Sequence, residues 1–271
     1  MHKVVIDGSK ARIKERMSKI KRKILVMSNK GGVGKSSAAL NFAALLHSRG
    51  SSVGLLDIDL HGPSMAKMAG VEGRSPEMDA ESLRPVEIRP GFNLMSMGFL
   101  TLEGRSPVIW RGPMKTSIVR QFLADVVWGE LDYLIVDSPP GTGDELLSIC
   151  QLITPLTGGI VVTTGQEIAL LDAMKAVNFL KTLGVPVLGV LENMTGFCCP
   201  HCSKEIDLFR SGGGLRAAGE LAVPFLGGVP FDAEIVEMSD QGKLFALERP
   251  ERPAAMALGA ALDKALAEIG T

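Results

Sequence analysis

The feature that most constrains the fold is a series of short, uninterrupted apolar segments that alternate with longer segments of helical composition. The expected strands are KILVMS (23–28), SVGLLDID (52–59), FNLMSM (92–97), LDYLIVD (131–137), GGIVVTT (158–164), PVLGVLEN (186–193) and VPFLGGVP (223–230), and helices are expected over 35–49, 113–128, 167–182 and 253–269. Continuous Val, Ile and Leu in strands separated by helices indicate a parallel sheet that is covered on both faces. We therefore predict a single α/β domain with a mostly parallel sheet, because no repeat or linker divides the chain.

The charge is concentrated at the start of the chain. The first 23 residues hold nine Lys and Arg against two acidic residues, whereas the whole chain of 271 residues carries a net charge of −1. We predict a basic helix over 9–22, with Ile13, Met17 and Ile20 on its apolar face, within an extension over 1–22 that precedes a main domain at 23–271. A basic helix can bind an anionic membrane or nucleic acid. Its narrow apolar stripe favours packing on the sheet instead, so we expect neither partner.

No apolar run reaches the roughly 18–20 residues that span a bilayer. No apolar signal-peptide core follows the basic start. We therefore expect a cytoplasmic protein.

The segment SNKGGVGKSS, residues 28–37, separates the first expected strand from the first helix. A glycine-rich turn at such a position exposes successive N–H groups that hold phosphate. The segment departs from G-x-x-x-x-G-K-[ST], because Asn29 stands where the first glycine belongs. Asn tolerates left-handed backbone angles, so we expect the turn to survive. The predicted nucleotide-binding residues of this loop are Asn29, Lys30, Gly31, Gly32, Val33, Gly34, Lys35, Ser36 and Ser37.

Aspartates end two of the expected strands. Asp57 and Asp59 end SVGLLDID, and Asp137 ends LDYLIVD. The carboxyl edge of a parallel sheet is where a carboxylate meets the Mg²⁺ of a bound nucleotide. We predict that Lys35 neutralises the β- and γ-phosphates, with Ser36 and Asp137 as Mg²⁺ ligands.

These segments together resemble the deviant Walker A class of P-loop ATPases, which includes MinD, ParA and the nitrogenase iron protein. KGGVGKSS carries the early lysine of that class. The segments DIDLHGPS, DSPPGTGD, TTGQEIALLDAMKAVNFLK, ENMTGFCCPHC and SDQGK narrow the resemblance to the Mrp (ApbC-like) family of iron–sulfur cluster carrier ATPases, over about residues 20–245. Asn29, His61 and Ser138 depart from the family pattern, and none removes a group that the chemistry needs.

The resemblance implies a role for each matching residue. Lys30 is the signature lysine, which reaches the nucleotide of a partner subunit. Lys35 and Asp59 complete the catalytic set, with Asp59 positioning the attacking water. Asp137 supports Mg²⁺. Asn193 reads the adenine edge, and an amide offers the donor and acceptor that this edge requires.

Three of the four cysteines lie within five residues, and Cys199 and Cys202 form a C-x-x-C on a loop at about 194–206. A zinc site or a cubane cluster needs four ligands. A second copy related by a twofold axis would supply the missing two, and the resemblance implies a [4Fe–4S] cluster bridging a homodimer. Zinc alone and a thiol–disulfide pair stay open as alternatives. Cys150 and Cys198 are not expected to be ligands.

The resulting hypothesis is a homodimeric carrier that receives iron–sulfur clusters from donors and transfers them to apoproteins, with weak ATP hydrolysis modulating the dimer. The first alternative is a positioning ATPase of the MinD/ParA kind, and the second is a zinc-binding scaffold that depends on nucleotide. The C-x-x-C favours the carrier, because a positioning ATPase has no use for it.

Overall fold

One eight-stranded sheet organises the protein. The computed structural model describes residues 8–59, 64–79, 82–100, 112–198, 202 and 204–270. The sheet order is β12-β9-β8-β1-β7-β2-β6-β5, and only the edge strand β5 runs antiparallel to its neighbour. The strands are β1 (Ile20–Met27), β2 (Val53–Asp57), β5 (Val86–Arg89), β6 (Phe92–Ser96), β7 (Leu131–Asp137), β8 (Gly158–Thr163), β9 (Val187–Asn193) and β12 (Phe225–Val229). The predicted fold class is confirmed.

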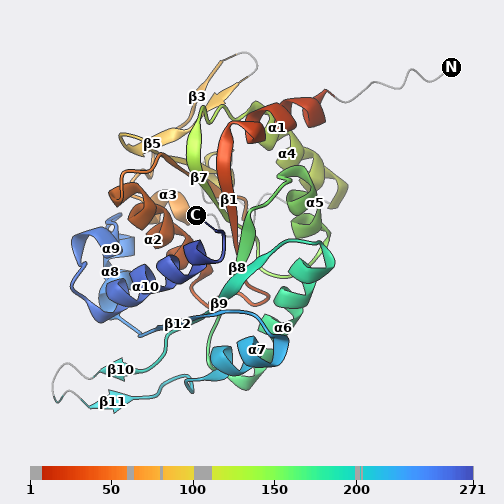
Figure 1. Ribbon diagram of the computed structural model, residues 1–271. Coiled ribbons are helices and arrows are strands. Elements are labelled where there is room, and N and C mark those ends of the chain that lie inside the picture. Colours follow the sequence, from red (N-terminus) through yellow and green to blue (C-terminus); the bar gives the residue numbers. More distant parts are fainter. Residues whose placement is uncertain are drawn as a thin grey trace.

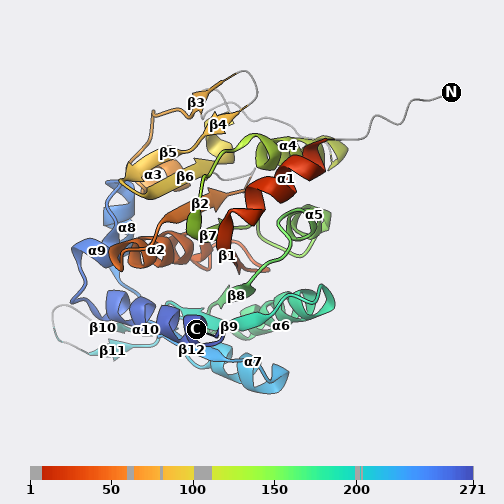
Figure 2. The same ribbon diagram turned by 45° about the horizontal axis from the view of Figure 1, so that its top comes forward.

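Helices cover both faces of the sheet (Figures 1 and 2). One face packs against α2, α9 and α10, and the other packs against α1 and α4 to α7. The helices are α1 (Ser9–Ser18), α2 (Lys35–Ser48), α3 (Met65–Met68), α4 (Gly112–Asp125), α5 (Asp144–Leu152), α6 (Glu167–Thr182), α7 (Gly213–Leu221), α8 (Ala233–Asp240), α9 (Phe245–Glu248) and α10 (Pro253–Ala267), with a 3₁₀ turn at Met97–Leu100. None of the helices in the described ranges is long and apolar enough to cross a membrane.

The basic N-terminal helix is shorter than expected and is part of the main body. It ends at Ser18, and β1 already begins at Ile20, so the predicted helix over 9–22 is wrong at its end. The expected division at residue 22 falls inside β1. The ammonium of the buried Lys23 donates to the carbonyls of Met17 and Ile20, at 3.2 Å each. The side chain thus caps the C-terminal end of α1. A local pattern of basic residues does not reveal such a cap.

Three small elements were not expected. The segment at 71–92, for which no element was expected, contains the hairpin of β3 (Glu77–Met78) and β4 (Leu83–Arg84) and the whole of β5. The residues on either side of the C-x-x-C form a second hairpin, from β10 (Phe197–Cys198) and β11 (Glu205–Ile206). Strands of two residues are too short to show any periodicity in the sequence.

The parallel register brings the ends of the central strands to one line. Asp57 of β2 is the direct partner of Asp137 of β7, and Val26 of β1 is the partner of Asp137 on the other side. The loop that follows β1 therefore emerges beside both aspartates. This carboxyl edge is where open α/β sheets bind their ligands.

Candidate functional site

The loop between β1 and α2 depends on glycine at two positions. Gly32 and Gly34 have φ angles of 82° and 85°, in the left-handed region that glycine adopts without strain. A Cβ on Gly34 would also lie 2.1 Å from Nδ2 of Asn193. The loop is therefore shaped by its own backbone and by the close approach of β9.

Asn29 does not use the left-handed angle that we expected of it. Within the described ranges the non-glycine residues with positive φ are Met194, Arg210 and Ala222. The side chain of Asn29 instead donates to Oδ1 of Asp172 on α6, at 2.7 Å. Asn29 thus ties the loop to a neighbouring helix, a contact between residues far apart in sequence.

Lys35 lies in a buried cluster of charge. Its ammonium donates to Oδ1 of Asp137 and to the hydroxyl of Ser36, the latter at 3.2 Å. Lys35 is 7% exposed and Asp137 is 1% exposed. Burial raises the pKa of Asp137, and the charge of Lys35 opposes that shift. The loop lysine, its hydroxyl neighbour and the strand-end carboxylate, all predicted from sequence, are within contact of one another.

Asp57 is a second buried carboxylate at the same place, and we did not assign it a role. Its oxygens accept from the hydroxyl of Ser96 at 2.7 Å and from the backbone N–H of Asp59 at 3.0 Å. Burial first, and then the charge of Asp137, raise the pKa of Asp57 to about 7. Two carboxylates thus share one lysine, and this excess of oxygen ligands over cations suits a divalent cation such as Mg²⁺. Asp59 itself is half-buried, two residues beyond β2.

Asn193 joins β9 to the loop. Its amide donates to the carbonyl of Val33 at 3.0 Å. It also lines a cavity of about 440 Å³, together with Met194, Pro230, Phe231 and Ile235. Gly34 and Ser37 form the end of this cavity nearest the loop. An apolar cavity that begins at a phosphate-type loop has the form of a site for a nucleobase.

The remaining loop residues face outward. Lys30, Gly31 and Gly32 are exposed. The Ser28 hydroxyl donates to the backbone carbonyl of Lys30 at 2.9 Å. In the part of the chain that the structure describes, the ammonium of Lys30 has no partner, so it is available to a group from outside.

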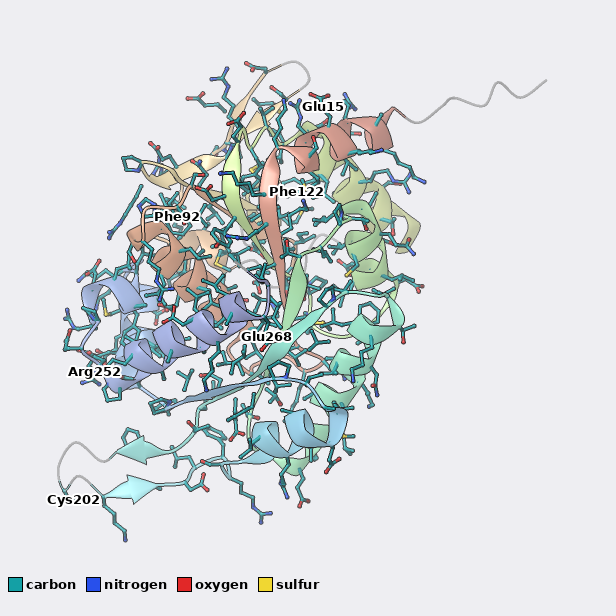
Figure 3. The ribbon with its side chains drawn as sticks, viewed as in Figure 1. Glu15, Phe92, Phe122, Cys202, Arg252 and Glu268 are labelled. Atoms are coloured by element: carbon teal, nitrogen blue, oxygen red, sulfur yellow. The ribbon has the colours of Figure 1, made fainter. Side chains whose placement is uncertain are left out.

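The hairpin of β10 and β11 extends away from the eight-stranded sheet and places Cys202 far from it (Figure 3). Cys202 is exposed at the end of this hairpin. Cys199 and His61 lie outside the described residues, as does the side chain of Cys198. The remaining cysteine, Cys150, is buried in the core, and burial raises the pKa of its thiol to about 11. Cys150 therefore behaves as a small apolar residue, as expected.

The base of the hairpin is bound to the wall of the cavity. The N–H of Thr195 donates to the carbonyl of Val229 at 2.9 Å, and the N–H of Phe231 donates to the carbonyl of Gly196 at 3.0 Å. The rings of Phe197 and Phe231 meet edge to face with centroids 5.8 Å apart. Phe231 lines the cavity, so one residue touches both the nucleobase-type cavity and the hairpin. No sequence motif pointed to this connection.

Known proteins resemble the chain over most of its length. An iron–sulfur cluster carrier protein of Methanocaldococcus jannaschii is 49% identical over 240 residues, which are 89% of this chain and 83% of that protein. The cytosolic Fe-S cluster assembly factor CFD1 of Saccharomyces cerevisiae is 48% identical over 225 residues, which are 81% of this chain and 77% of that protein.

Solved structures give the same result. A nucleotide-binding protein of Archaeoglobus fulgidus in complex with ADP is 36% identical, with a TM-score of 0.77, over 90% of this chain and 95% of that one. The cell division ATPase MinD of Pyrococcus furiosus shares the fold at 22% identity and a TM-score of 0.66, over 90% and 97%.

The family model described as "ParA: NUBPL iron-transfer P-loop NTPase" matches residues 19–266. This span includes the loop at 28–37, the strand-end aspartates and the cysteine hairpin. The chain therefore belongs to the NUBPL iron-transfer P-loop NTPases of the ParA group.

Proposed function

We propose that the protein binds iron–sulfur clusters and transfers them to apoproteins, and that ATP binding and hydrolysis modulate this transfer. The observation that carries the proposal is the exposed cysteine hairpin attached, through Phe197 and Phe231, to the cavity beside the phosphate-type loop. The names of the relatives from M. jannaschii and yeast support the same activity. The fold alone would also suit a positioning ATPase, but the hairpin and the iron-transfer family favour the carrier.

The nucleotide would lie along the loop and into the cavity. The N–H groups between Gly31 and Ser36 would hold the phosphates, and Lys35 would neutralise their charge. Asn193 would exchange its bond to Val33 for the edge of the adenine. The ADP bound to the A. fulgidus protein supports nucleotide binding here.

Magnesium fits the acidic group next to this loop. Ser36 and Asp137 would ligate the ion, which would neutralise the phosphate charge that develops during hydrolysis. Asp57 would be a further oxygen acceptor beside the ion, and its hydrogen bonds from Ser96 and Asp59 would hold it in place. Asp59 would hold the attacking water. Lys35 contacts both Ser36 and Asp137, so these two oxygen donors already lie close together.

A homodimer would complete both sites. Each chain offers Cys199 and Cys202, whereas a [4Fe–4S] cluster needs four thiolates. The exposed Lys30 would reach the nucleotide of the second copy. Exposed apolar side chains also lie on the elements beside the loop and hairpin, at Ile168 and Leu171 of α6 and Leu215 of α7, which are 56–69% exposed. An isologous interface buries such a surface twice.

The partners follow from this activity. They are a second copy of the chain, donors of clusters and apoprotein acceptors, and we expect no membrane or nucleic acid among them. The yeast relative is named cytosolic, which supports a cytoplasmic location for this chain.

Anaerobic reconstitution with iron and sulfide tests the proposal. We expect about four irons per two chains, a dimer, and the absorption of a [4Fe–4S] cluster. Cys199→Ala or Cys202→Ala should abolish iron uptake. Cys150→Ala is the matched control and should leave the iron content unchanged, because Cys150 is buried away from the hairpin. Uptake of zinc without any iron–sulfur chromophore would reject the carrier function.

A further inference from the structure

Two adjacent residues at the end of β9 face opposite sides of the sheet. Side chains alternate along a strand, and here Leu191 belongs to the core on the α2 side whereas Val190 belongs to the core on the α7 side. Asn193, two residues after Leu191, bonds to the loop at Val33. Glu192, two residues after Val190, bonds to the backbone at the start of α7. One strand end therefore contacts two different parts of the site.

Glu192 is a buried carboxylate with no part in the chemistry described above. It is 1% exposed. Its Oε1 accepts from the N–H of Gly212 at 2.7 Å and its Oε2 accepts from the N–H of Gly214 at 2.6 Å. These N–H groups belong to the start of α7, where a carboxylate is favoured by the unpaired donors and the helix dipole. Charge-assisted bonds of this kind are among the strongest in proteins.

The surroundings of Glu192 leave little freedom for movement. A Cβ on Gly214 would lie 2.9 Å from both Cβ and Oε2 of Glu192. A Cβ on Gly165, in the loop before α6, would lie 1.5 Å from the carbonyl oxygen of Arg210. The end of β9 is therefore closely packed against the start of α7, with little free space between them.

The segment that carries the cysteines begins and ends at strained residues. Met194, directly after Asn193, has a φ of 61°, and Arg210, three residues before the first residue of α7, has a φ of 60°. Left-handed angles at non-glycine residues are strained and cluster at ligand clamps and switch regions. Met194 also lines the cavity. The hairpin at 195–209 thus lies between two strained positions, with Glu192 holding the chain beyond the second.

We propose that Glu192 is the positioning residue through which nucleotide binding at Asn193 alters the cysteine hairpin. When the base takes the amide of Asn193, the bond to Val33 is released and the end of β9 shifts. Glu192 carries this shift to Gly212 and Gly214, and from there to the arm that contains Cys202. The inference rests on the proposed function and adds the route by which ATP regulates cluster retention.

Hydrogen exchange of the cluster-free protein tests the route without relying on activity. ATP with Mg²⁺ should change the exchange of the wild-type amides at 205–216. Glu192→Gln leaves one N–H facing an amide donor, so these amides should exchange about tenfold faster without nucleotide, and the effect of ATP on them should disappear. Glu220→Gln, on the exposed side of α7, is the matched control and should keep the wild-type response.

A second measurement uses the loaded dimer. Iron release to a chelator should differ between ATP-bound and nucleotide-free wild type, and this difference should vanish in Glu192→Gln while iron content after reconstitution stays unchanged. A residue that only stabilises the fold would lower iron retention equally in both states.

The two proposals fail differently. If ATP leaves the exchange of the wild-type segment at 205–216 unchanged, or if Glu192→Gln keeps the ATP effect, the route through Glu192 is wrong. Either result would leave cluster loading and the cysteine assignments intact. The ATP effect on the exchange of the wild-type amides tests the route even if Glu192→Gln does not fold.

Discussion

The nucleotide-type site and the cysteine hairpin lie at the same edge of the sheet but are built in opposite ways. Asp57 and Asp137 are buried at the ends of central strands, and the buried Lys35 at the start of α2 bonds to Asp137. Cys202 is exposed, on a hairpin whose strands are two residues long. Phosphoryl transfer needs fixed charges away from water, whereas a cargo must be accessible to be delivered. In the proposed homodimer the nucleotide site would take only Lys30 from the second copy, whereas the cluster site would take two of its four thiolates from it.

The strongest test of this contrast is Lys35→Ala. It removes the cation shared by Asp57 and Asp137, so hydrolysis should be lost and folding should weaken by up to about 3–5 kcal/mol, the cost of leaving a buried charge unpaired. Iron uptake at the hairpin should persist in the folded fraction. Urea unfolding, phosphate release and iron content measure the three effects.

A double variant separates the effect of Lys35 on stability from its effect on hydrolysis. Lys35→Ala with Asp137→Asn removes the repulsion between the carboxylates and should recover part of the stability without recovering hydrolysis. Hydrolysis at the wild-type rate in Lys35→Ala would show that the loop does not serve the nucleotide.

Phe197→Ala should affect the hairpin alone. It removes an edge-to-face contact with Phe231, worth about 0.5–1.5 kcal/mol beyond the area buried. Because Phe231 still lines the cavity, nucleotide affinity should change little, while the cluster should be lost to a chelator several-fold faster. An equal fall in nucleotide affinity and cluster retention would mean that the two regions are not separable at this contact.

The sequence predicts well those parts of the fold that depend on short, continuous segments of residues. The strands ending at Asp57, Asp137 and Asn193 are continuous apolar segments, and the loop at 28–37 has its own spacing. The expected fold class and family are confirmed.

The contacts that join these parts were not predictable from local patterns. Ser96 reaches Asp57 from the next strand, and Asn29 reaches Asp172 on a distant helix. Glu192 was read only as part of a strand, although its carboxylate caps α7. Such contacts depend on the packing of elements far apart in the chain, and no spacing rule contains that information.

A second buried lysine, Lys23, has an ammonium that lacks a carboxylate partner among the described residues, in contrast to Lys35. Lys23 donates only to backbone carbonyls, and burial lowers the pKa of its ammonium. The unfolded chain then binds more protons than the folded one between the lowered pKa and the ordinary value of 10.5, so the stability of the wild type rises with pH across that window. Lys23→Met lacks this rise. Thermal unfolding at several pH values between 8 and 10.5 should therefore show the stability of the wild type rising relative to that of Lys23→Met. If the stability of both proteins changed equally with pH, the burial of the Lys23 charge would be contradicted.

The smallest expected effect on folding belongs to the residue with the largest expected effect on cargo. Cys202→Ser changes an exposed side chain, so the free energy of unfolding of the cluster-free protein should stay within about 0.5 kcal/mol of wild type. Iron uptake should nevertheless be lost, because serine does not replace a thiolate. Cys150→Ser is the matched control, since it buries a hydroxyl in the core and should cost about 1–3 kcal/mol while leaving iron uptake intact. If Cys202→Ser destabilised the cluster-free chain as much as Cys150→Ser, the hairpin would be part of the folded core rather than an arm that carries cargo.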